Sequence, residues 1–134
     1  MAAGDRWLIA GLGYSGEAIA RHLVGAGAEV TATTRDPGSR KAPAGVALVA
    51  FAAAGPAIRD ATHLLVTAPP GAAGDPLLAQ HAAAIEAASA LRWIGYLSTT
   101  GVYGDRGGTA VTEATEPRPH QDRSIRRRAA EQQW

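Results

Sequence analysis

The feature that most constrains this chain is a glycine-rich stretch, GLGYSG at residues 11–16, which directly follows the apolar run Trp7–Ala10. A short apolar run that stops at glycines is typical of a buried strand. Glu17–Val24 then has apolar residues one helical turn apart and is followed by glycines, which predicts a helix. The β-branched residues of Glu29–Thr34 predict a second strand. The start of the chain therefore predicts a strand–turn–helix–strand unit with a parallel crossover.

Strands and helices continue to alternate along the rest of the chain. The pattern predicts further strands at Val46–Phe51, His63–Thr67 and Trp93–Ser98, helices at Leu77–Leu91 and from Asp122 to Trp134, and a short helix between the third and fourth strands. Residues 101–119 are rich in glycine and proline and predict a loop. This alternation is typical of an α/β fold, a doubly wound parallel sheet of the Rossmann type with about five strands and helices on both faces.

Composition limits the class of protein. The 134 residues, 46% hydrophobic and 19% charged, are enough for one domain with a core. The absence of cysteine excludes disulfides, and the net charge of +1 provides no field that would attract nucleic acid or an acidic membrane. The sequence shows no secretory signal and no membrane span, so we expect a cytoplasmic protein. The last helix reaches Trp134 without an end signal, so we expect residues 1–134 to be an incomplete, C-terminally truncated domain without its substrate lobe.

The place of GLGYSG between a predicted strand and a predicted helix makes the glycine pattern informative. Gly11 would form the tight turn, Gly13 would let the backbone approach a pyrophosphate, and Gly16 would let the helix pack closely on the strand. Tyr14 and Ser15 would lie at the helix N-terminus, where unpaired N–H groups and the helix dipole favour an anion. The stretch predicts a dinucleotide-binding turn, with a purely structural turn as the alternative.

The end of the second strand bears on which dinucleotide would bind. An acidic residue there typically accepts a hydrogen bond from the ribose 2′-OH of NAD. This chain has Thr33, Thr34 and Arg35 at that place, and a guanidinium can pair with a 2′-phosphate, so we expect NADP, with NAD as the alternative. If the strand ended one residue later, Asp36 would become the ribose acid and the preference would reverse. A solvated Arg35 without a ligand also remains open.

Two further segments follow predicted strands and would lie at the same edge of the sheet. The first, TAPPG, contains Ala68, Pro69 and Pro70, which would form a wall beside the ribose or nicotinamide, or else only a stiff loop. The second, STTGVYG, places the hydroxyls of Ser98 and Thr99 at a strand end. Such hydroxyls can bind a substrate carbonyl or hydroxyl, although they often only cap the backbone.

In this order, GLGYSG, LLVTAPPG and YLSTTGVYGD resemble the short-chain dehydrogenase/reductase superfamily, and more narrowly its extended or atypical branch of NAD-dependent epimerase/dehydratase-like proteins. The resemblance covers nearly the whole chain, and STTGVYGD is its most specific part. It implies a nicotinamide dinucleotide cofactor, a small-molecule or nucleotide-linked substrate, and a homodimer as an option. It also implies that Thr99 occupies the place of the active-site Ser/Thr that binds the reacting oxygen of the substrate.

The chain departs from that family at the Tyr-x-x-x-Lys pair expected on the next helix. Counting back from Glu131, which resembles the glutamate that follows the pair, the two places fall on Arg123 and Arg127. An arginine stays protonated at neutral pH and cannot relay a proton, so the standard mechanism lacks its acid. Arg127 could replace the lysine as a positive charge, but the plainer interpretation of RSIRRR is a solvated helix face. The four histidines have no metal-ligand spacing, so we expect structural roles for them and no metal.

Three functions follow from these observations. The first is an NADP-preferring oxidoreductase or epimerase/dehydratase-like enzyme of the atypical short-chain family. The second is a non-catalytic dinucleotide-binding sensor or regulatory module, which loss of the tyrosine and lysine favours. The third is a Rossmann domain of another dehydrogenase family, in which STTGVYG would be an unrelated loop.

Overall fold

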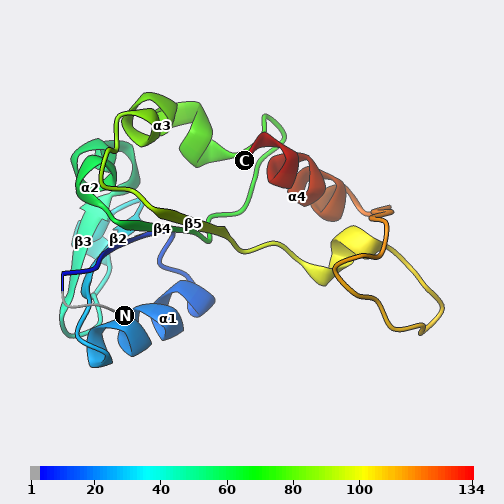
Figure 1. Ribbon diagram of the computed structural model, residues 1–134, viewed down its shortest axis with the longest axis horizontal. Coiled ribbons are helices and arrows are strands. Elements are labelled where there is room, and N and C mark those ends of the chain that lie inside the picture. The colour runs from blue at the N-terminus through cyan, green and yellow to red at the C-terminus, as the bar shows by residue number, and fades with distance from the viewer. Residues whose placement is uncertain (1–3) are drawn as a thin grey trace. The chain divides into compact units, whose positions relative to one another are not determined.

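The computed structural model describes residues 4–134. Within that range the strands form one parallel sheet with the order β3-β2-β1-β4-β5 (Figure 1). The strands are β1 (Arg6–Ala10), β2 (Glu29–Thr34), β3 (Val46–Ala50), β4 (His63–Val66) and β5 (Trp93–Tyr96). The predicted α/β fold with a doubly wound parallel sheet is therefore confirmed.

Strand β1 lies at the centre of the sheet because its side chains can be buried on both faces. Leu8, Ile9 and Ala10 are at most 1% exposed, and β1 pairs with β2 on one side and with β4 on the other. A strand buried on both faces reads as a continuous apolar run, which explains why WLIA contains no alternating polar residues. The glycine-rich stretch thus begins where the central strand ends.

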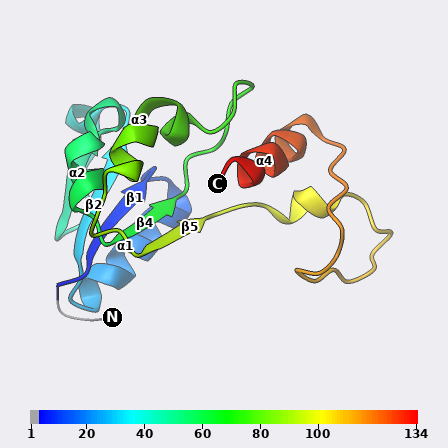
Figure 2. The same cartoon turned by 45° about the horizontal axis from the view of Figure 1, so that its top comes forward.

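Helices cover both faces of this sheet (Figure 1, Figure 2). Helix α1 (Tyr14–Gly25) lies on one face, whereas α2 (Gly55–Asp60) and α3 (Pro76–Glu86) lie on the other. This division follows from right-handed crossovers, because the chain moves from β1 outward to β2 and β3 and then returns past β1 to β4. None of the helices found within residues 4–134 is long and apolar enough to cross a membrane.

Several element boundaries differ by one residue from the sequence prediction, and three differ by two residues or more. Helix α1 begins at Tyr14 rather than Glu17, because Gly13 serves as the extended N-cap residue. Helix α3 ends at Glu86 rather than Leu91, and in the following turn the N–H of Ala88 bonds to the carbonyl of Ile85, three residues back. Strand β5 ends at Tyr96 rather than Ser98, because Tyr96 pairs with Val66, the last residue of its neighbour.

The described residues form two compact units. The first contains residues 4–68 and Leu77–Tyr96, and therefore the whole sheet with α1 and α2. The second contains Pro69–Pro76 and Leu97–Trp134, and it includes a 3-10 turn at Thr100–Tyr103 (η3) and helix α4 (Asp122–Gln133). The region predicted as a loop, 101–119, thus starts within a short 3-10 turn.

Candidate functional site

The turn between β1 and α1 needs glycine at two positions. Gly11 has φ +114°, and a Cβ built there would lie 2.7 Å from the Thr67 hydroxyl and 2.9 Å from the backbone nitrogen of Ala68. A Cβ at Gly16 would lie 2.5 Å from the carbonyl oxygen of Gly11. All three distances are below van der Waals contact, so a side chain at either position would displace the turn. Gly11 shapes the corner, and Gly16 lets α1 approach it.

Gly13 differs from these two glycines. Its φ of −93° is accessible to any residue, and a Cβ built there meets no atom of the described chain within 4 Å. Tyr14 and Ser15, which follow it, are exposed, Tyr14 almost completely at 96%. No side chain caps the helix at Gly13, so the first N–H groups of α1 have no side-chain acceptor, and the space around the Gly13 Cα is open. A Cβ at Gly13 would only occupy the space in which an anion could approach those N–H groups, so the residues present fit a phosphate.

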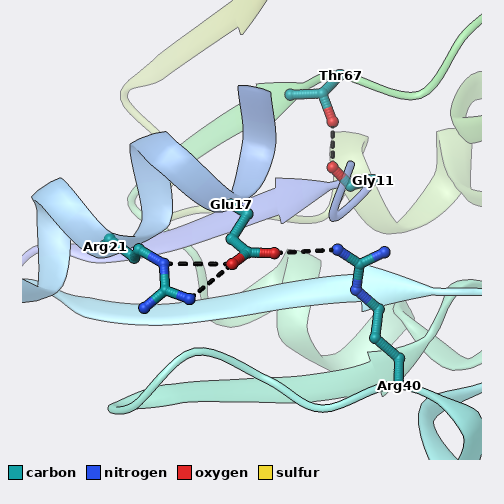
Figure 3. A network of polar contacts seen from close by, with 5 residues as sticks. All are labelled: Gly11, Glu17, Arg21, Arg40 and Thr67. Carbon is teal, nitrogen blue, oxygen red and sulfur yellow. Dashed lines mark hydrogen bonds and ion pairs between the residues drawn. The ribbon is translucent and has the colours of Figure 1, made fainter. Parts of the chain in front are cut away.

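Two threonine hydroxyls bind the backbone of Gly11 from opposite sides. The N–H of Gly11 donates to the hydroxyl oxygen of Thr33 on β2 at 2.9 Å. The hydroxyl of Thr67, directly after β4, donates to the carbonyl of Gly11 (Figure 3) and also lies 3.1 Å from the carbonyl of Ala10. Sequence reasoning did not assign either contact. The available signal was a threonine at the end of each strand that flanks the central one.

An ion-pair network lies in the first turns of α1 (Figure 3). The carboxylate of Glu17 lies 2.6 Å from the guanidinium of Arg21 and 3.3 Å from that of Arg40. The hydrogen bond from Arg21, helped by its charge and by Arg40, holds the pKa of Glu17 below its ordinary value of 4.5. Glu17 is therefore ionised at neutral pH, and the two guanidinium groups balance its charge. The positive end of α1 keeps its attraction for an anion.

The end of β2 shows whether the strand is long enough to give Asp36 the place of the ribose-binding acid. The strand stops at Thr34, and Arg35 and Asp36 are exposed. One carboxylate oxygen of Asp36 accepts from the N–H of Gly38 at 3.0 Å and caps the 3-10 turn at Pro37–Ser39. Strand β2 therefore does not include Arg35, and Asp36 does not take the place of the ribose-binding acid that a strand one residue longer would give it. Among the described residues 4–134, the guanidinium of Arg35 has no hydrogen-bond or ion-pair partner.

In the second unit, helix α4 is bonded to the segment that carries Ser98 and Thr99. The hydroxyl of Ser98 donates to Glu131, and the guanidinium of Arg127 donates to the carbonyl of Leu97 at 2.8 Å. The hydroxyl of Thr99 accepts from the N–H of Gly101 at 3.2 Å and caps η3. Thr99 thus has the capping role expected of a strand-end hydroxyl, and its side chain remains exposed.

The arginine-rich stretch of α4 is only partly a solvated face. Arg123 and Arg126 are exposed, as predicted, whereas Arg127 and Arg128 are half-buried. Arg128 lies 2.8 Å from Glu131, and Arg127 binds the backbone as described above. A solvated face is therefore the wrong interpretation for Arg127, because its long side chain reaches the preceding segment of the same unit.

The predicted site residues are divided between the two units. The first unit brings together those at the carboxyl ends of the neighbouring strands β2, β1 and β4, namely Gly11, Gly13, Tyr14, Ser15, Gly16, Thr34, Arg35 and Ala68. The second unit contains Pro69, Pro70, Ser98 and Thr99. In that unit a pocket of about 370 Å³ lies between η3 and the start of α4, and its lining includes Asp105, His120 and Arg123. His120, for which the sequence predicts a structural role, is one of the residues that line this pocket.

The other histidines have structural surroundings or are exposed. The ring of His81 lies 2.7 Å from the carbonyl of Phe51, and the ring of His63 stacks on Trp7 with centroids 4.5 Å apart. His22 is exposed on α1. Among residues 4–134 there is no cluster of three or more His, Cys, Asp or Glu side chains suited to a metal ion.

Known structures resemble the chain across nearly its whole length. A functionally unknown conserved protein from Silicibacter pomeroyi is 38% identical, with a TM-score of 0.87 over 97% of this chain and 48% of its own. A provisionally assigned NAD-dependent epimerase/dehydratase from Methylobacillus flagellatus is 25% identical, with a TM-score of 0.75 over 96% of this chain and 50% of its own. A short-chain dehydrogenase/reductase superfamily protein from Agrobacterium tumefaciens with bound NAD is 19% identical, with a TM-score of 0.68 over 95% and 43%.

No family model and no curated protein matches the chain. The chain spans about half the length of the solved structures described above. Its sheet order, its glycine turn and these structural neighbours agree with the motifs found in the sequence. The resemblance predicted from the sequence is therefore confirmed, and the chain has the Rossmann-type fold of NAD-dependent epimerase/dehydratase-like proteins of the short-chain dehydrogenase/reductase superfamily.

Proposed function

We propose that the chain is the dinucleotide-binding part of an NADP-preferring oxidoreductase or epimerase/dehydratase-like protein of the atypical short-chain family. The observation that carries this proposal is the turn at residues 11–16. Its uncapped helix N-terminus faces open space at Gly13, where a Cβ would meet nothing in the described chain. A diphosphate there would accept hydrogen bonds from the N–H groups of Tyr14 and Ser15.

The preference for NADP rests on the end of β2. Arg35 is exposed and makes no ion pair in the described range, so its guanidinium is available to a 2′-phosphate. Asp36, the acid that follows Arg35 in the sequence, has one carboxylate oxygen engaged by the N–H of Gly38. Thr34 would add a hydroxyl beside the ribose. From the sequence pattern we also propose Ala68 of the first unit, and Pro69, Pro70 and Ser98 of the second unit, as cofactor-binding residues.

When bound, a nicotinamide dinucleotide would supply hydride chemistry to the site. Within this chain, Thr99 is the residue proposed to hold the reacting oxygen of a small-molecule or nucleotide-linked substrate, because its hydroxyl is exposed and accepts only one backbone N–H. The acid that the missing tyrosine would supply would have to come from the substrate, from water or from another residue. We propose no proton relay through Arg123 or Arg127.

A second function, a non-catalytic NAD(P)-binding sensor, is favoured by one specific observation. Arg127, which occupies the place of the family's lysine, donates to the carbonyl of Leu97 and so stabilises α4 against the preceding segment. A residue engaged in this way contributes to structure rather than to proton transfer. Turnover separates the two functions: oxidation of NADPH with a panel of carbonyl compounds supports the enzyme, whereas tight binding without turnover by the intact protein supports the sensor.

The cofactor proposal is tested by calorimetric titration of the wild type and of Arg35→Ala with NADP and with NAD. We expect Arg35→Ala to weaken NADP binding about tenfold or more and to leave NAD binding within about twofold. Arg59→Ala, which removes an exposed arginine of α2, is the matched control and should change neither affinity. Equal losses for both cofactors would contradict a role of Arg35 in reading the phosphate. A wild type that binds neither cofactor would overturn the proposed function itself.

A further inference from the structure

The backbone groups of the glycine turn fall into two sets. One set is bonded within the protein: the N–H of Gly11 to Thr33, the N–H of Leu12 to the carbonyl of Thr33 at 2.9 Å, and the carbonyl of Gly11 to the hydroxyl of Thr67. The other set is the uncapped N–H groups that follow Gly13. The protein therefore satisfies the strand end of the turn and leaves the helix end for a ligand.

The two threonines are well placed to maintain this division. Thr33 is completely buried, so water cannot replace the N–H of Gly11 as the hydrogen-bond partner of its hydroxyl. Thr67 is half-buried and approaches Gly11 from β4, the strand on the other side of β1. Gly11 has φ +114°, one of several conformations open to glycine, so its orientation is fixed by its contacts, which are these two hydroxyls and the bond from its N–H to the carbonyl of Ile9 at 3.1 Å. A rotation of the Gly11 peptide would move Gly13 and the start of α1, because only one residue separates them.

We propose that Thr33 and Thr67 are positioning residues for the dinucleotide: their hydroxyls hold the two sides of Gly11 so that the helix N-terminus meets the diphosphate in a fixed orientation. This inference rests on the proposed function and deepens it. It assigns the affinity for cofactor partly to two side chains that contact the turn rather than the ligand.

The experiment compares Thr33→Val and Thr67→Val with Thr33→Ser and Thr67→Ser in NADPH titrations monitored by fluorescence. Valine keeps the shape of threonine but removes the hydroxyl, whereas serine keeps the hydroxyl. Each valine variant should weaken binding about tenfold, and each serine variant should stay within about threefold of wild type. Thr31→Val is the matched control, since Thr31 is a half-buried threonine of the same strand, paired with Leu8 and remote from the turn.

Two readouts separate positioning from a merely structural contribution. Melting curves identify a temperature at which all variants are folded, and the affinities are compared there. Amide exchange of Gly11, measured without cofactor, should accelerate in Thr33→Val but not in Thr33→Ser. If Thr33→Val does not fold, the half-buried Thr67 provides the test through its own pair of variants.

The outcomes are distinguishable. If Thr33→Val and Thr67→Val are folded and bind NADPH as tightly as the wild type, the positioning role is overturned and the proposed function stays intact. A wild type that binds neither NADPH nor NADH overturns the proposed function, and the positioning role falls with it. Weaker binding by the valine variants with recovery in the serine variants supports the inference.

Discussion

The glycine turn permits a substitution that separates stability from ligand binding. Gly13→Ala places a methyl group where the described chain has no atom within 4 Å, at a φ of −93° that alanine adopts without strain. Reduced freedom of the unfolded chain stabilises by about 0.4–1 kcal/mol. The loss of a favourable N-cap residue costs about 0.5–1.5 kcal/mol. These effects nearly cancel, so the free energy of unfolding should stay within about 1 kcal/mol of wild type.

Binding should respond differently, because the added methyl group occupies the space through which a diphosphate would reach the first turn of α1. We expect the affinity for NADP to fall at least about tenfold, which corresponds to about 1.4 kcal/mol. The assay combines urea unfolding with a calorimetric titration of the same preparations. Gly13→Ala that binds NADP as tightly as wild type would refute the assignment of this turn as the diphosphate site.

Gly11→Ala is the matched contrast within the same turn. Its φ of +114° is unfavourable for alanine by about 1–2 kcal/mol. The methyl group would also overlap Thr67 and Ala68, which adds about 1–3 kcal/mol. We therefore expect a loss of about 2–5 kcal/mol in the free energy of unfolding. Equal stabilities for the two variants would show that the turn does not have the geometry described.

The remaining predictions concern charge, core and the second unit. The pKa of Glu17 is lowered in the folded state, so its ion pairs stabilise the fold above pH 4.5, and this contribution is lost as the pH falls through that lower pKa. Glu17→Gln should therefore reduce the dependence of the urea midpoint on pH below 4.5. An unchanged pH profile would contradict the network. Ile58→Ala removes a fully buried side chain of α2 and should cost about 2–5 kcal/mol in urea unfolding, whereas a loss below about 1 kcal/mol would contradict its burial. Arg127→Gln should accelerate amide exchange of residues 97–101, which are tied to α4 through Leu97. Arg126→Gln, at an exposed arginine of the same helix, is the control, and equal exchange rates in the two variants would contradict the contact.

The fold was predictable because its signals are local and consistent. A continuous apolar run before glycines indicates a central strand, and each later strand is separated from the next by a helix or turn signal. The ends of elements were less predictable. Nothing in the sequence of β5 marks Tyr96 as its last residue, since that end is set by the length of its neighbour β4. The alanine-rich end of α3 likewise contains no glycine or proline to show that the helix stops at Glu86.

The candidate site was predictable to the extent that it depends on backbone conformation. Positive φ and close packing require glycine, so Gly11 and Gly16 can be recognised in the sequence. Side-chain hydrogen bonds between strands leave no such mark. Thr33 and Thr67 are separated by 34 positions in the sequence and meet at Gly11 only because β2 and β4 both pair with β1. Their contacts therefore require knowledge of the strand order.

The different requirements for glycine in one turn indicate how such a site can be maintained. Gly11 and Gly16 are needed by the folded chain itself, so substitutions there reduce stability whether or not a ligand is present. Gly13 has no such requirement in the described structure, and other residues at this N-cap, such as serine or aspartate, would stabilise α1 by supplying a hydrogen-bond acceptor. A helix start that forgoes this stabilisation keeps its N–H groups unpaired. Glycine is itself an accepted N-cap residue, about a few tenths of a kcal/mol less favourable than serine or aspartate, so the uncapped start of α1 costs the fold little and leaves room for the anion that we propose at this turn.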